Sequence, residues 1–262
     1  MKKRLLITGA NGMLGGTLVK LFQNKFDVFA TGNKKTSFPF VKNYLSFDLD
    51  TSSYANLIEW SNPDIVVHCA ALTNGNYCQQ NPAEAFKING ISLKEFTSVV
   101  NNETRIIYIS TDAVFSSQLH MASEKDCLRP ENIYGKSKEL GEFFLINSEA
   151  EYTIVRTTIV GLNFNPSKVG FVEWIINSAK NDQEISLFDD VLFSPITIWD
   201  LAEQLEHIID SGFVYSKEIL HIAGKEPCTK YRFGIDLLEK MDLPLRQVQK
   251  GSINEMQSRA KR

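Results

Sequence analysis

Short apolar segments alternate with longer segments of helical period along the first two thirds of the chain. The apolar segments, which are typical of buried strands, lie at residues 4–8, 27–31, 44–48, 64–70, 105–110 and 152–156. The segments of helical period between them include residues 13–24, 83–101 and 131–147. Parallel strands linked by crossover helices produce this alternation. The pattern therefore predicts an α/β fold with a doubly wound parallel sheet, a Rossmann fold.

The regularity loosens after the sixth predicted strand. Further helices are predicted at residues 171–180, 198–211 and 231–240, and short strands at 185–188 and 219–222. We expect a Rossmann domain over residues 1–162. Residues 163–262 are expected to form mainly a small C-terminal subdomain, with some of its segments returning to the Rossmann domain.

Composition and charge narrow the class of protein. With 262 residues, 43% of them hydrophobic, the chain can bury a substantial core. A net charge of -3 provides no basic field for nucleic acid or an anionic membrane, so we expect a small-molecule partner. The four cysteines have neither CxxC nor zinc-ligand spacing, and no segment is long and apolar enough to span a membrane. We expect no metal site and a cytoplasmic location.

A glycine-rich turn joins the first predicted strand to the first predicted helix. Gly9, Gly12 and Gly15 allow backbone amides and the helix N-terminus to approach a pyrophosphate. This GxxGxxG spacing is typical of short-chain reductases and predicts a dinucleotide cofactor. The intervening residues predicted to line the same site are Asn11, Met13 and Leu14. The alternative is a turn whose glycines serve only tight packing of strand and helix.

The end of the second predicted strand bears on the choice of cofactor. Asn33, Lys34 and Lys35 stand where an NAD site usually has an acidic residue. Two lysines without a carboxylate favour a 2'-phosphate, hence NADPH, with NADH as the alternative. A solvated lysine loop is the other interpretation. Asp48 and Leu49 are predicted at the adenine, although Asp48 could instead cap the next helix.

The fourth predicted strand leads into a loop at the carboxyl edge of the sheet, where ligands bind in such folds. Ala70, Ala71 and Thr73 in this loop have small side chains, which allow a cofactor to lie close to the backbone. Asn89, on the following predicted helix, either contacts the same region or is an interior helix asparagine.

Three residues predict the chemistry. Tyr134 and Lys138 lie four apart on a predicted helix, and Thr111 ends the preceding strand. Since a free tyrosine has a pKa of about 10, a neighbouring ammonium would make it a usable proton donor at neutral pH. We expect Tyr134 to protonate a carbonyl oxygen and Thr111 to hydrogen-bond it. Lys138 would lower the tyrosine pKa and hold the nicotinamide ribose, while the cofactor supplies the hydride. The alternative is an exposed Tyr–Lys pair without a catalytic role.

With these motifs the chain resembles the extended short-chain dehydrogenase/reductase superfamily, and within it the dTDP-4-dehydrorhamnose reductase family. The resemblance rests on TGANGMLGG, STDAVF and YGKSK, together with AALTNGNYCQQNPAEAFKING, VRTTIVG, FSPITIWDLAE and LHIAGKEPCTKYRFG. It implies NADPH-dependent reduction of the 4-keto group of a nucleotide-linked 6-deoxy sugar, in polysaccharide or deoxysugar synthesis. The same resemblance makes residues 163–262 mainly substrate-binding and Thr111, Tyr134 and Lys138 the catalytic triad. A homodimer is a further expectation.

Two residues depart from the family pattern. Ala113 stands where the family usually has a tyrosine, and Ile159 where it usually has a tryptophan, both near the sugar. Loss of these aromatic side chains removes stacking surface and a hydroxyl, so we expect a sugar other than dTDP-4-dehydrorhamnose. A non-catalytic NADP-binding subunit, similar to the regulatory subunit of methionine adenosyltransferase, is one alternative. A sugar-nucleotide epimerase and a reductase of a small ketone are others. The retained triad favours a reductase.

Overall fold

The computed structural model describes residues 2–34, 41–165 and 168–253. Its main element is a seven-stranded parallel sheet with the strand order β11-β6-β5-β4-β1-β2-β3. These strands are β1 (Arg4–Thr8), β2 (Asp27–Gly32), β3 (Asn43–Ser46), β4 (Ile65–His68), β5 (Arg105–Thr111), β6 (Glu151–Thr157) and β11 (Glu218–Ile222). The predicted doubly wound parallel sheet is confirmed.

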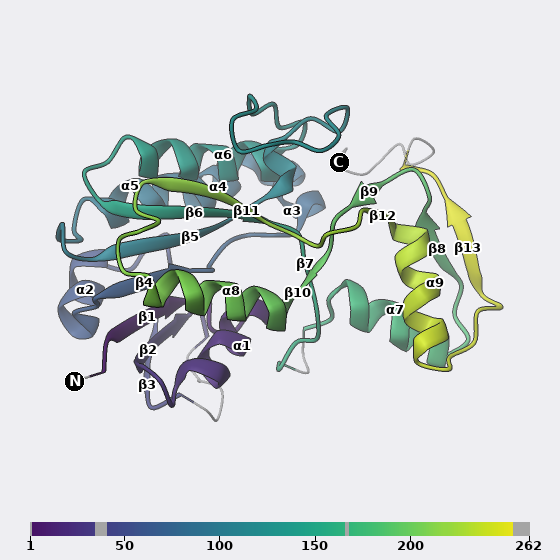
Figure 1. Cartoon of the computed structure of the whole chain (residues 1–262), viewed down its shortest axis with the longest axis horizontal. Coiled ribbons are helices and arrows are strands. Elements are labelled where there is room, and N and C mark those ends of the chain that lie inside the picture. Colours follow the sequence, from purple (N-terminus) through teal and green to yellow (C-terminus); the bar gives the residue numbers. More distant parts are fainter. Residues whose placement is uncertain (1, 35–40, 166–167, 254–262) are drawn as a thin grey trace.

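Helices cover both faces of this sheet (Figure 1). Alternate residues along each strand point to opposite faces. On β1, Leu5 and Ile7 join a core with α1 (Met13–Phe22) and α8 (Ile198–Asp210), whereas Leu6 packs on the other face. The second core includes side chains of α2 (Tyr54–Ser61), α5 (Ser92–Thr97) and α6 (Ile133–Ile146).

The helix predicted at residues 83–101 is present, but it ends earlier and is not regular. α4 (Pro82–Phe86), a π-helical turn (Lys87–Ile91) and α5 form one continuous helical run, after an additional short helix, α3 (Gly75–Gln80). The π turn packs closely on α6: a Cβ on Gly90 would lie 2.7 Å from Leu140, and one on Gly141 would lie 2.5 Å from the Asn89 carbonyl oxygen. This close helix contact is long-range, so periodicity could not predict it.

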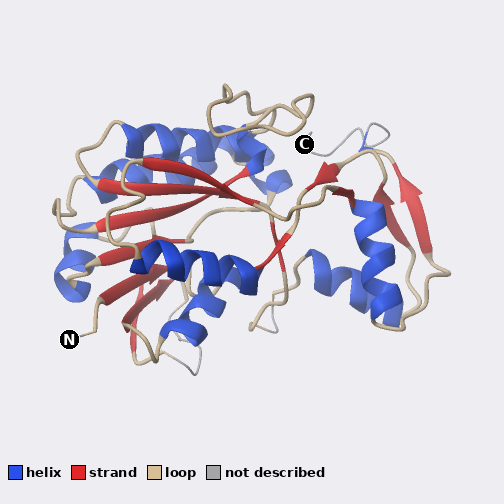
Figure 2. Cartoon of the chain, in the orientation of Figure 1, coloured by secondary structure: helices blue, strands red, loops and turns tan. Residues whose placement is uncertain are grey.

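A smaller unit lies beside the carboxyl ends of the main strands, as Figure 2 shows. It contains α7 (Phe171–Lys180), α9 (Lys230–Lys240), and the parallel pair β8 (Ile185–Phe188) and β13 (Val248–Gly251). Two further pairs of two-residue strands are β7 (Ile159–Val160) with β10 (Ile196–Thr197), and β9 (Leu192–Phe193) with β12 (Cys228–Thr229). Strand β11 belongs to the main sheet, and helix α8 packs against this sheet, although both follow residue 162.

Candidate active site

The end of β5 and the start of α6 meet at the carboxyl edge of the sheet. Thr111 is the last residue of β5, and Tyr134 is the second residue of α6. The Asn132 side chain caps α6 by accepting a 2.8 Å hydrogen bond from the Gly135 amide. A Cβ on Gly135 would lie 2.1 Å from the Ala113 carbonyl oxygen, so the first turn of α6 touches the turn that follows Thr111. The structure thus places the segments of Thr111 and Tyr134 side by side.

Thr111 is buried, with 6% of its surface exposed. Its hydroxyl accepts a hydrogen bond from the Ala113 amide (3.2 Å) and donates to the Asp112 carboxylate (3.0 Å). The threonine therefore caps the 3₁₀ turn Asp112–Val114, and its donor must turn from Asp112 to reach a substrate oxygen.

Lys138 is almost completely buried, with 1% of its surface exposed, one turn after Tyr134. Its Nζ donates a 2.8 Å hydrogen bond to the Ile109 carbonyl oxygen and lies 3.9 Å from the centre of the Tyr108 ring. Burial lowers the pKa of Lys138 to about 7, although the carboxylate of Glu142 acts to raise it. The alternative of an exposed Tyr–Lys pair is therefore wrong.

The glycine-rich turn has the backbone geometry that its sequence predicts. Gly9 has φ +70°, and a Cβ there would lie 2.8 Å from backbone atoms of Ala70. A Cβ on Gly15 would lie 2.4 Å from the Gly9 carbonyl oxygen. Gly12 is the N-cap of α1 and has no side chain to bond the first amides of this helix. The first turn of α1 can therefore receive a phosphate.

Side chains within this turn face inward. Asn11 is buried, and its Oδ1 accepts a 2.8 Å hydrogen bond from the Tyr44 hydroxyl. A Cβ on Gly32 would lie only 1.7 Å from that Oδ1, so Asn11 fills the space beside β2. Leu14 belongs to the core under α1, and Met13 is half-buried at the start of the helix. The side chains of Asn11 and Leu14 thus shape the turn from within.

A basic corner follows β2. Asn33 and Lys34 are exposed, and the Lys34 carbonyl oxygen accepts a 2.7 Å hydrogen bond from the Tyr44 hydroxyl. Lys35 lies outside the described residues. Sequence reasoning missed Lys168: burial lowers its pKa, and the Lys34 ammonium lowers it further. The charge of Lys34 therefore acts on Lys168.

The segment before α7 explains how Lys168 reaches this corner. Phe164 lies 3.8 Å from the position of a Cβ on Gly16, and the Lys20 ammonium is 4.6 Å from the centre of the Phe164 ring. This segment therefore crosses α1 close to the glycine-rich turn.

The residues predicted at the adenine lie just beyond β3. Asp48 is exposed, and its Oδ1 accepts a 2.8 Å hydrogen bond from the Asp50 amide. Ser53, not Asp48, caps α2, so the capping alternative is wrong. Leu49 is half-buried against the second core. Adenine contact by Asp48 and Leu49 stays a prediction.

Asn89 holds the loop after β4 with its whole side-chain amide. Its Oδ1 accepts from the Leu72 amide (2.7 Å), and its Nδ2 donates to the Leu72 carbonyl oxygen (2.9 Å) and to the Ser137 hydroxyl (2.9 Å). Because Asn89 is 1% exposed and fully engaged, its part in the site is to position this loop. Ala70 and Ala71 are half-buried and Thr73 is exposed on the loop.

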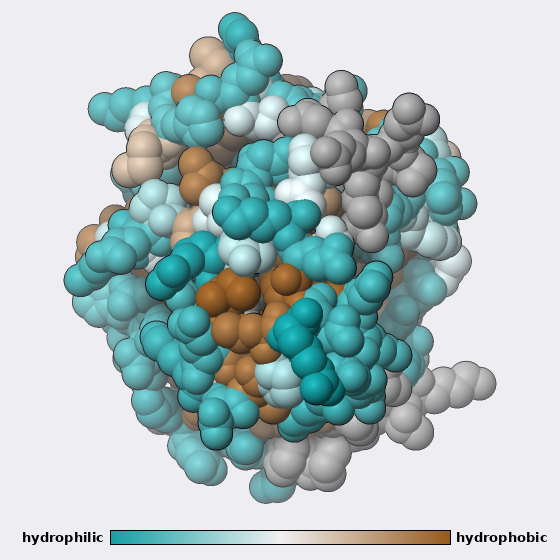
Figure 3. All heavy atoms as spheres, turned by 90° about the vertical axis from the view of Figure 1, so that its right-hand side faces the viewer, coloured by the Kyte–Doolittle hydropathy of each residue, from teal (hydrophilic) through white to brown (hydrophobic). Residues whose placement is uncertain are grey.

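On the smaller unit, aromatic side chains gather beside α7. Phe171 stacks on Trp174 and Phe233, with ring centres 6.2 and 5.8 Å apart, and the Lys230 ammonium is 3.3 Å from the centre of the Phe193 ring. Figure 3 shows a strip of apolar surface among polar side chains on this side of the molecule. The smaller unit thus offers both apolar surface and positive charge.

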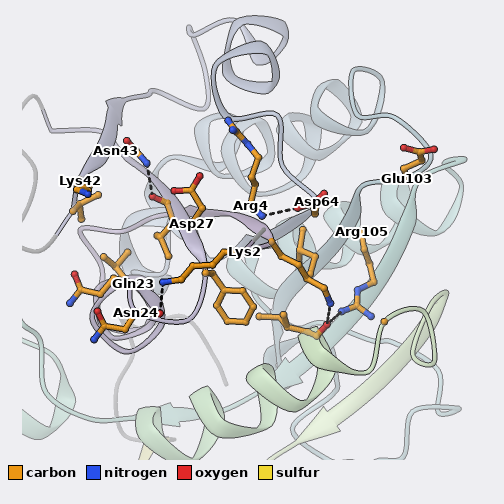
Figure 4. A pocket seen from close by; sticks show the side chains of 18 of the residues that line it. Lys2, Arg4, Gln23, Asn24, Asp27, Lys42, Asn43, Asp64, Glu103 and Arg105 are labelled. Atoms are coloured by element: carbon orange, nitrogen blue, oxygen red, sulfur yellow. Dashed lines mark hydrogen bonds between the residues drawn. The ribbon is translucent and has the colours of Figure 1, made fainter.

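A wide groove of about 1080 Å³ lies at the opposite, amino edge of the sheet (Figure 4). Lys2, Arg4, Asp64 and Arg105 are among the side chains that line it. Arg105 begins β5 and Thr111 ends it, so the length of a strand separates this groove from the catalytic residues. It carries none of the predicted site.

Among residues 2–34, 41–165 and 168–253, no group of three or more His, Cys, Asp or Glu side chains is placed to hold a metal ion. In the same ranges, none of the helices has the length and apolar character needed to cross a membrane.

Comparisons with known proteins identify the family of the chain. The family model described as RmlD substrate binding domain matches residues 2–262. The spore coat polysaccharide biosynthesis protein SpsK of Bacillus subtilis is 32% identical in an alignment of 246 residues, and the match covers 92% of this chain and 80% of that protein. Methionine adenosyltransferase 2 subunit beta of Bos taurus is 27% identical over 262 residues, covering 92% of this chain and 73% of that one.

A solved structure extends the comparison to the cofactor. The dTDP-4-dehydrorhamnose reductase of Bacillus anthracis, in complex with NADP, superposes with a TM-score of 0.87 at 28% identity. The match covers 100% of this chain and 88% of that one. The family and these structural neighbours are NAD(P)-dependent reductases of the extended short-chain type, in agreement with the resemblance seen in the sequence.

Proposed function

The chain belongs to the RmlD substrate-binding family, and from this premise we propose that it is an NADPH-dependent reductase of the keto group of a nucleotide-linked sugar. The observation that carries the proposal is the burial of Lys138 beneath the end of β5, one turn after Tyr134 and beside the segment that follows Thr111. Because its side chain is shielded from solvent, Lys138 does not act as an ordinary surface lysine.

The residues of the site fit a dinucleotide. Gly9, Gly12 and Gly15 leave the first turn of α1 open to a pyrophosphate. When bound, NADPH supplies the hydride. Tyr134 donates a proton to the carbonyl oxygen as negative charge develops there, and Thr111 turns its hydroxyl to the same oxygen. Lys138 provides positive charge beneath the tyrosine and holds the nicotinamide ribose.

The preference for NADPH rests on Lys34 and Lys168. Their charges act on one another at the corner that follows β2, and two neighbouring ammonium groups suit a dianionic 2'-phosphate. We expect NADPH to bind at least about tenfold more tightly than NADH, and Lys168→Ala to reduce this ratio. Isothermal titration measures both affinities, with Lys125→Ala as a control in an exposed loop. Equal affinities in the wild type would contradict the assignment.

The sugar is proposed to be a 4-keto-6-deoxy sugar other than dTDP-4-dehydrorhamnose. Ala113 lies in the turn beside the start of α6 and presents a small side chain there. Ile159 packs against the main core, which leaves no aromatic ring at its position. The similarity to SpsK favours a role in surface polysaccharide synthesis.

A panel of dTDP-, GDP- and UDP-linked 4-keto-6-deoxy sugars tests the activity through NADPH oxidation. Tyr134→Phe should lower the rate at least about a hundredfold because the proton donor is lost, whereas NADPH binding should persist. A wild-type rate no higher than that of Tyr134→Phe on every sugar would refute the reductase.

The similarity to methionine adenosyltransferase 2 subunit beta supports a second candidate, a non-catalytic NADP-binding regulatory subunit. NADPH binding without turnover, together with co-purification of a larger enzyme, would favour it. A sugar-nucleotide epimerase is the third candidate. It would retain bound NAD and interconvert two sugar nucleotides without net oxidation of NADPH.

A homodimer is proposed through the outer face of α4 and α6. Phe143 and Ile146 are 55% and 43% exposed on α6. An adjoining hollow of about 570 Å³ is lined by Phe86, Pro130 and Leu140. Because the protruding ring and the hollow share one face, a two-fold axis would place each ring in the partner's hollow. Light scattering after gel filtration should show a dimer, and a monomer for Phe143→Glu; a wild-type monomer would contradict this.

A further inference from the structure

We propose that Glu142 is a positioning residue for the reaction: its carboxylate, held by Arg156 and Ser110, ties α6 to the ends of two strands and keeps the Lys138 ammonium charged. This inference rests on the proposed function, because it concerns the lysine of that site. Glu142 follows Lys138 by one helical turn on α6.

The first support is the geometry around the carboxylate. Arg156 Nε lies 3.1 Å from both Glu142 oxygens, and its Nη2 lies 2.7 Å from Oε2. Ser110 donates a 2.5 Å hydrogen bond to Oε1. Ser110 and Arg156 are paired neighbours on β5 and β6. One carboxylate therefore fixes the helix carrying Lys138 to the residue that precedes Thr111.

The second support is the burial of the network. Glu142 is 0% exposed, and Arg156 and Ser110 are each 4% exposed. A buried ion pair gives little net stability, because the loss of hydration opposes the attraction between the charges. Apolar side chains of similar size could close this interior at least as well. Net stability alone is therefore a weak explanation for the pair, and one helical turn away on α6 is the buried ammonium of Lys138.

The third support is the set of titratable groups around Lys138. Burial lowers the pKa of His68 to about 3 and raises that of Cys69 to about 12, and it raises the pKa of Tyr108 well above its usual value. These three groups are uncharged near pH 7, and Tyr134 carries a phenol. Glu142 thus provides the carboxylate charge that acts on the ammonium and opposes its desolvation.

The network also extends to the substrate side of the site. Arg156 lies 5.2 Å from the centre of the Phe115 ring, and its Nη1 lies 3.5 Å from His221 Nε2. The Glu124 carboxylate accepts a 2.9 Å hydrogen bond from the His221 amide. The loop that follows Thr111 is therefore held in part by contacts with Arg156, the ion-pair partner of Glu142.

The direct test is the pKa of Lys138, measured by NMR titration of protein labelled at lysine Cε. The Lys138 resonance is assigned by its disappearance in Lys138→Met. Glu142→Gln keeps the shape of the side chain and removes its charge. We expect the Lys138 pKa to fall by roughly one unit, the low end for the loss of a neighbouring opposite charge. Ser110→Ala removes one hydrogen bond without changing any charge and should leave this pKa in place.

Arg156 would be left without its partner in Glu142→Gln, so Glu142→Gln/Arg156→Gln is measured beside it. An unchanged Lys138 pKa in a folded variant would overturn the proposal. So would failure of the double variant to fold, because Glu142 would then serve the fold alone. The titration needs no turnover. An inactive wild type therefore counts against the proposed function and leaves the test of Glu142 intact.

If the wild type does reduce a ketosugar, a second readout follows. The alkaline limb of its kcat/KM profile should move to lower pH in Glu142→Gln, because Lys138 loses its proton more readily. Affinity for NADPH, measured below that limb, should change less than about threefold, since the phosphate-binding turn is not touched. A profile that falls uniformly at every pH would indicate a structural role only.

Discussion

Replacement of Lys138 by methionine should stabilise the protein while it abolishes the proposed activity. Methionine has a similar length and no charge to desolvate. Lowering the pKa of Lys138 from 10.5 to about 7 corresponds to about 5 kcal/mol against folding at low pH. The variant loses the hydrogen bond to Ile109 and the contact with the Tyr108 ring, which together offset about 2–3 kcal/mol. A net gain of about 2 kcal/mol at pH 7 remains.

The dependence on pH identifies the cause. The folded pKa of Lys138 lies below the unfolded one, so between about pH 7 and 10.5 the unfolded chain binds more protons. The free energy of unfolding of the wild type therefore rises with pH in this window. Below it, Lys138 is protonated in both the folded and the unfolded chain, and the full cost of burying the ammonium opposes folding. The advantage of Lys138→Met should shrink by about 2 kcal/mol between roughly pH 7 and 9.

Urea unfolding of both proteins across this range provides the measurement, with Lys180→Met as a control at an exposed position on α7. The control should stay within about 0.5 kcal/mol of the wild type at each pH. The reasoning is refuted if Lys138→Met is no more stable than the wild type near neutral pH. A gain that does not change with pH would also refute it, because desolvation of the ammonium would then not be its source.

Two further predictions concern glycines that determine the site. Gly9→Ala should cost at least about 2 kcal/mol and abolish NADPH binding, because φ is +70° and the new Cβ would lie 2.8 Å from Ala70. Gly212→Ala, with φ +64° and open space around it, should cost only about 1–2 kcal/mol in unfolding and leave binding unchanged. Gly135→Ala would push α6 away from the Ala113 carbonyl oxygen. We expect kcat to fall at least about tenfold with little change in NADPH affinity. An unchanged kcat would contradict the close contact.

Local sequence was sufficient to predict the main sheet and to single out the glycine-rich turn and the Tyr134–Lys138 segment as a candidate site. The glycine spacing at residues 9–15 and the tyrosine and lysine at 134 and 138 express backbone conformation and helical periodicity, which a single segment determines. Most strands of the sheet are predictable because they are short, apolar, buried runs, whereas β3 and β11 at the two edges are only partly buried. Two-residue strands such as β7 and β12 have no periodicity to detect.

Contacts between distant segments could not be predicted in this way. The sequence does not decide between a cofactor contact and an interior role for Asn89, because its partners Leu72 and Ser137 lie 17 and 48 residues away. Lys168 reaches the corner at Lys34 only because its segment crosses α1. Their residue types are ordinary for a helix and a loop, and only the fold gives them neighbours.

Glu142 and Arg156 show why such contacts matter for the chemistry. A lysine with a pKa of about 7 is protonated in only part of the molecules at neutral pH. Small changes in the surrounding charge therefore change its protonated fraction strongly. Burial alone would lower that pKa further, and a solvent-exposed carboxylate would be screened from the site. A carboxylate that is itself buried avoids screening, but it requires a cation and hydrogen-bond donors of its own. Arg156 and Ser110 meet that requirement. Because both lie on strands, their hydrogen bonds hold the Glu142 carboxylate, whose charge acts on the pKa of Lys138, in a fixed position relative to the sheet.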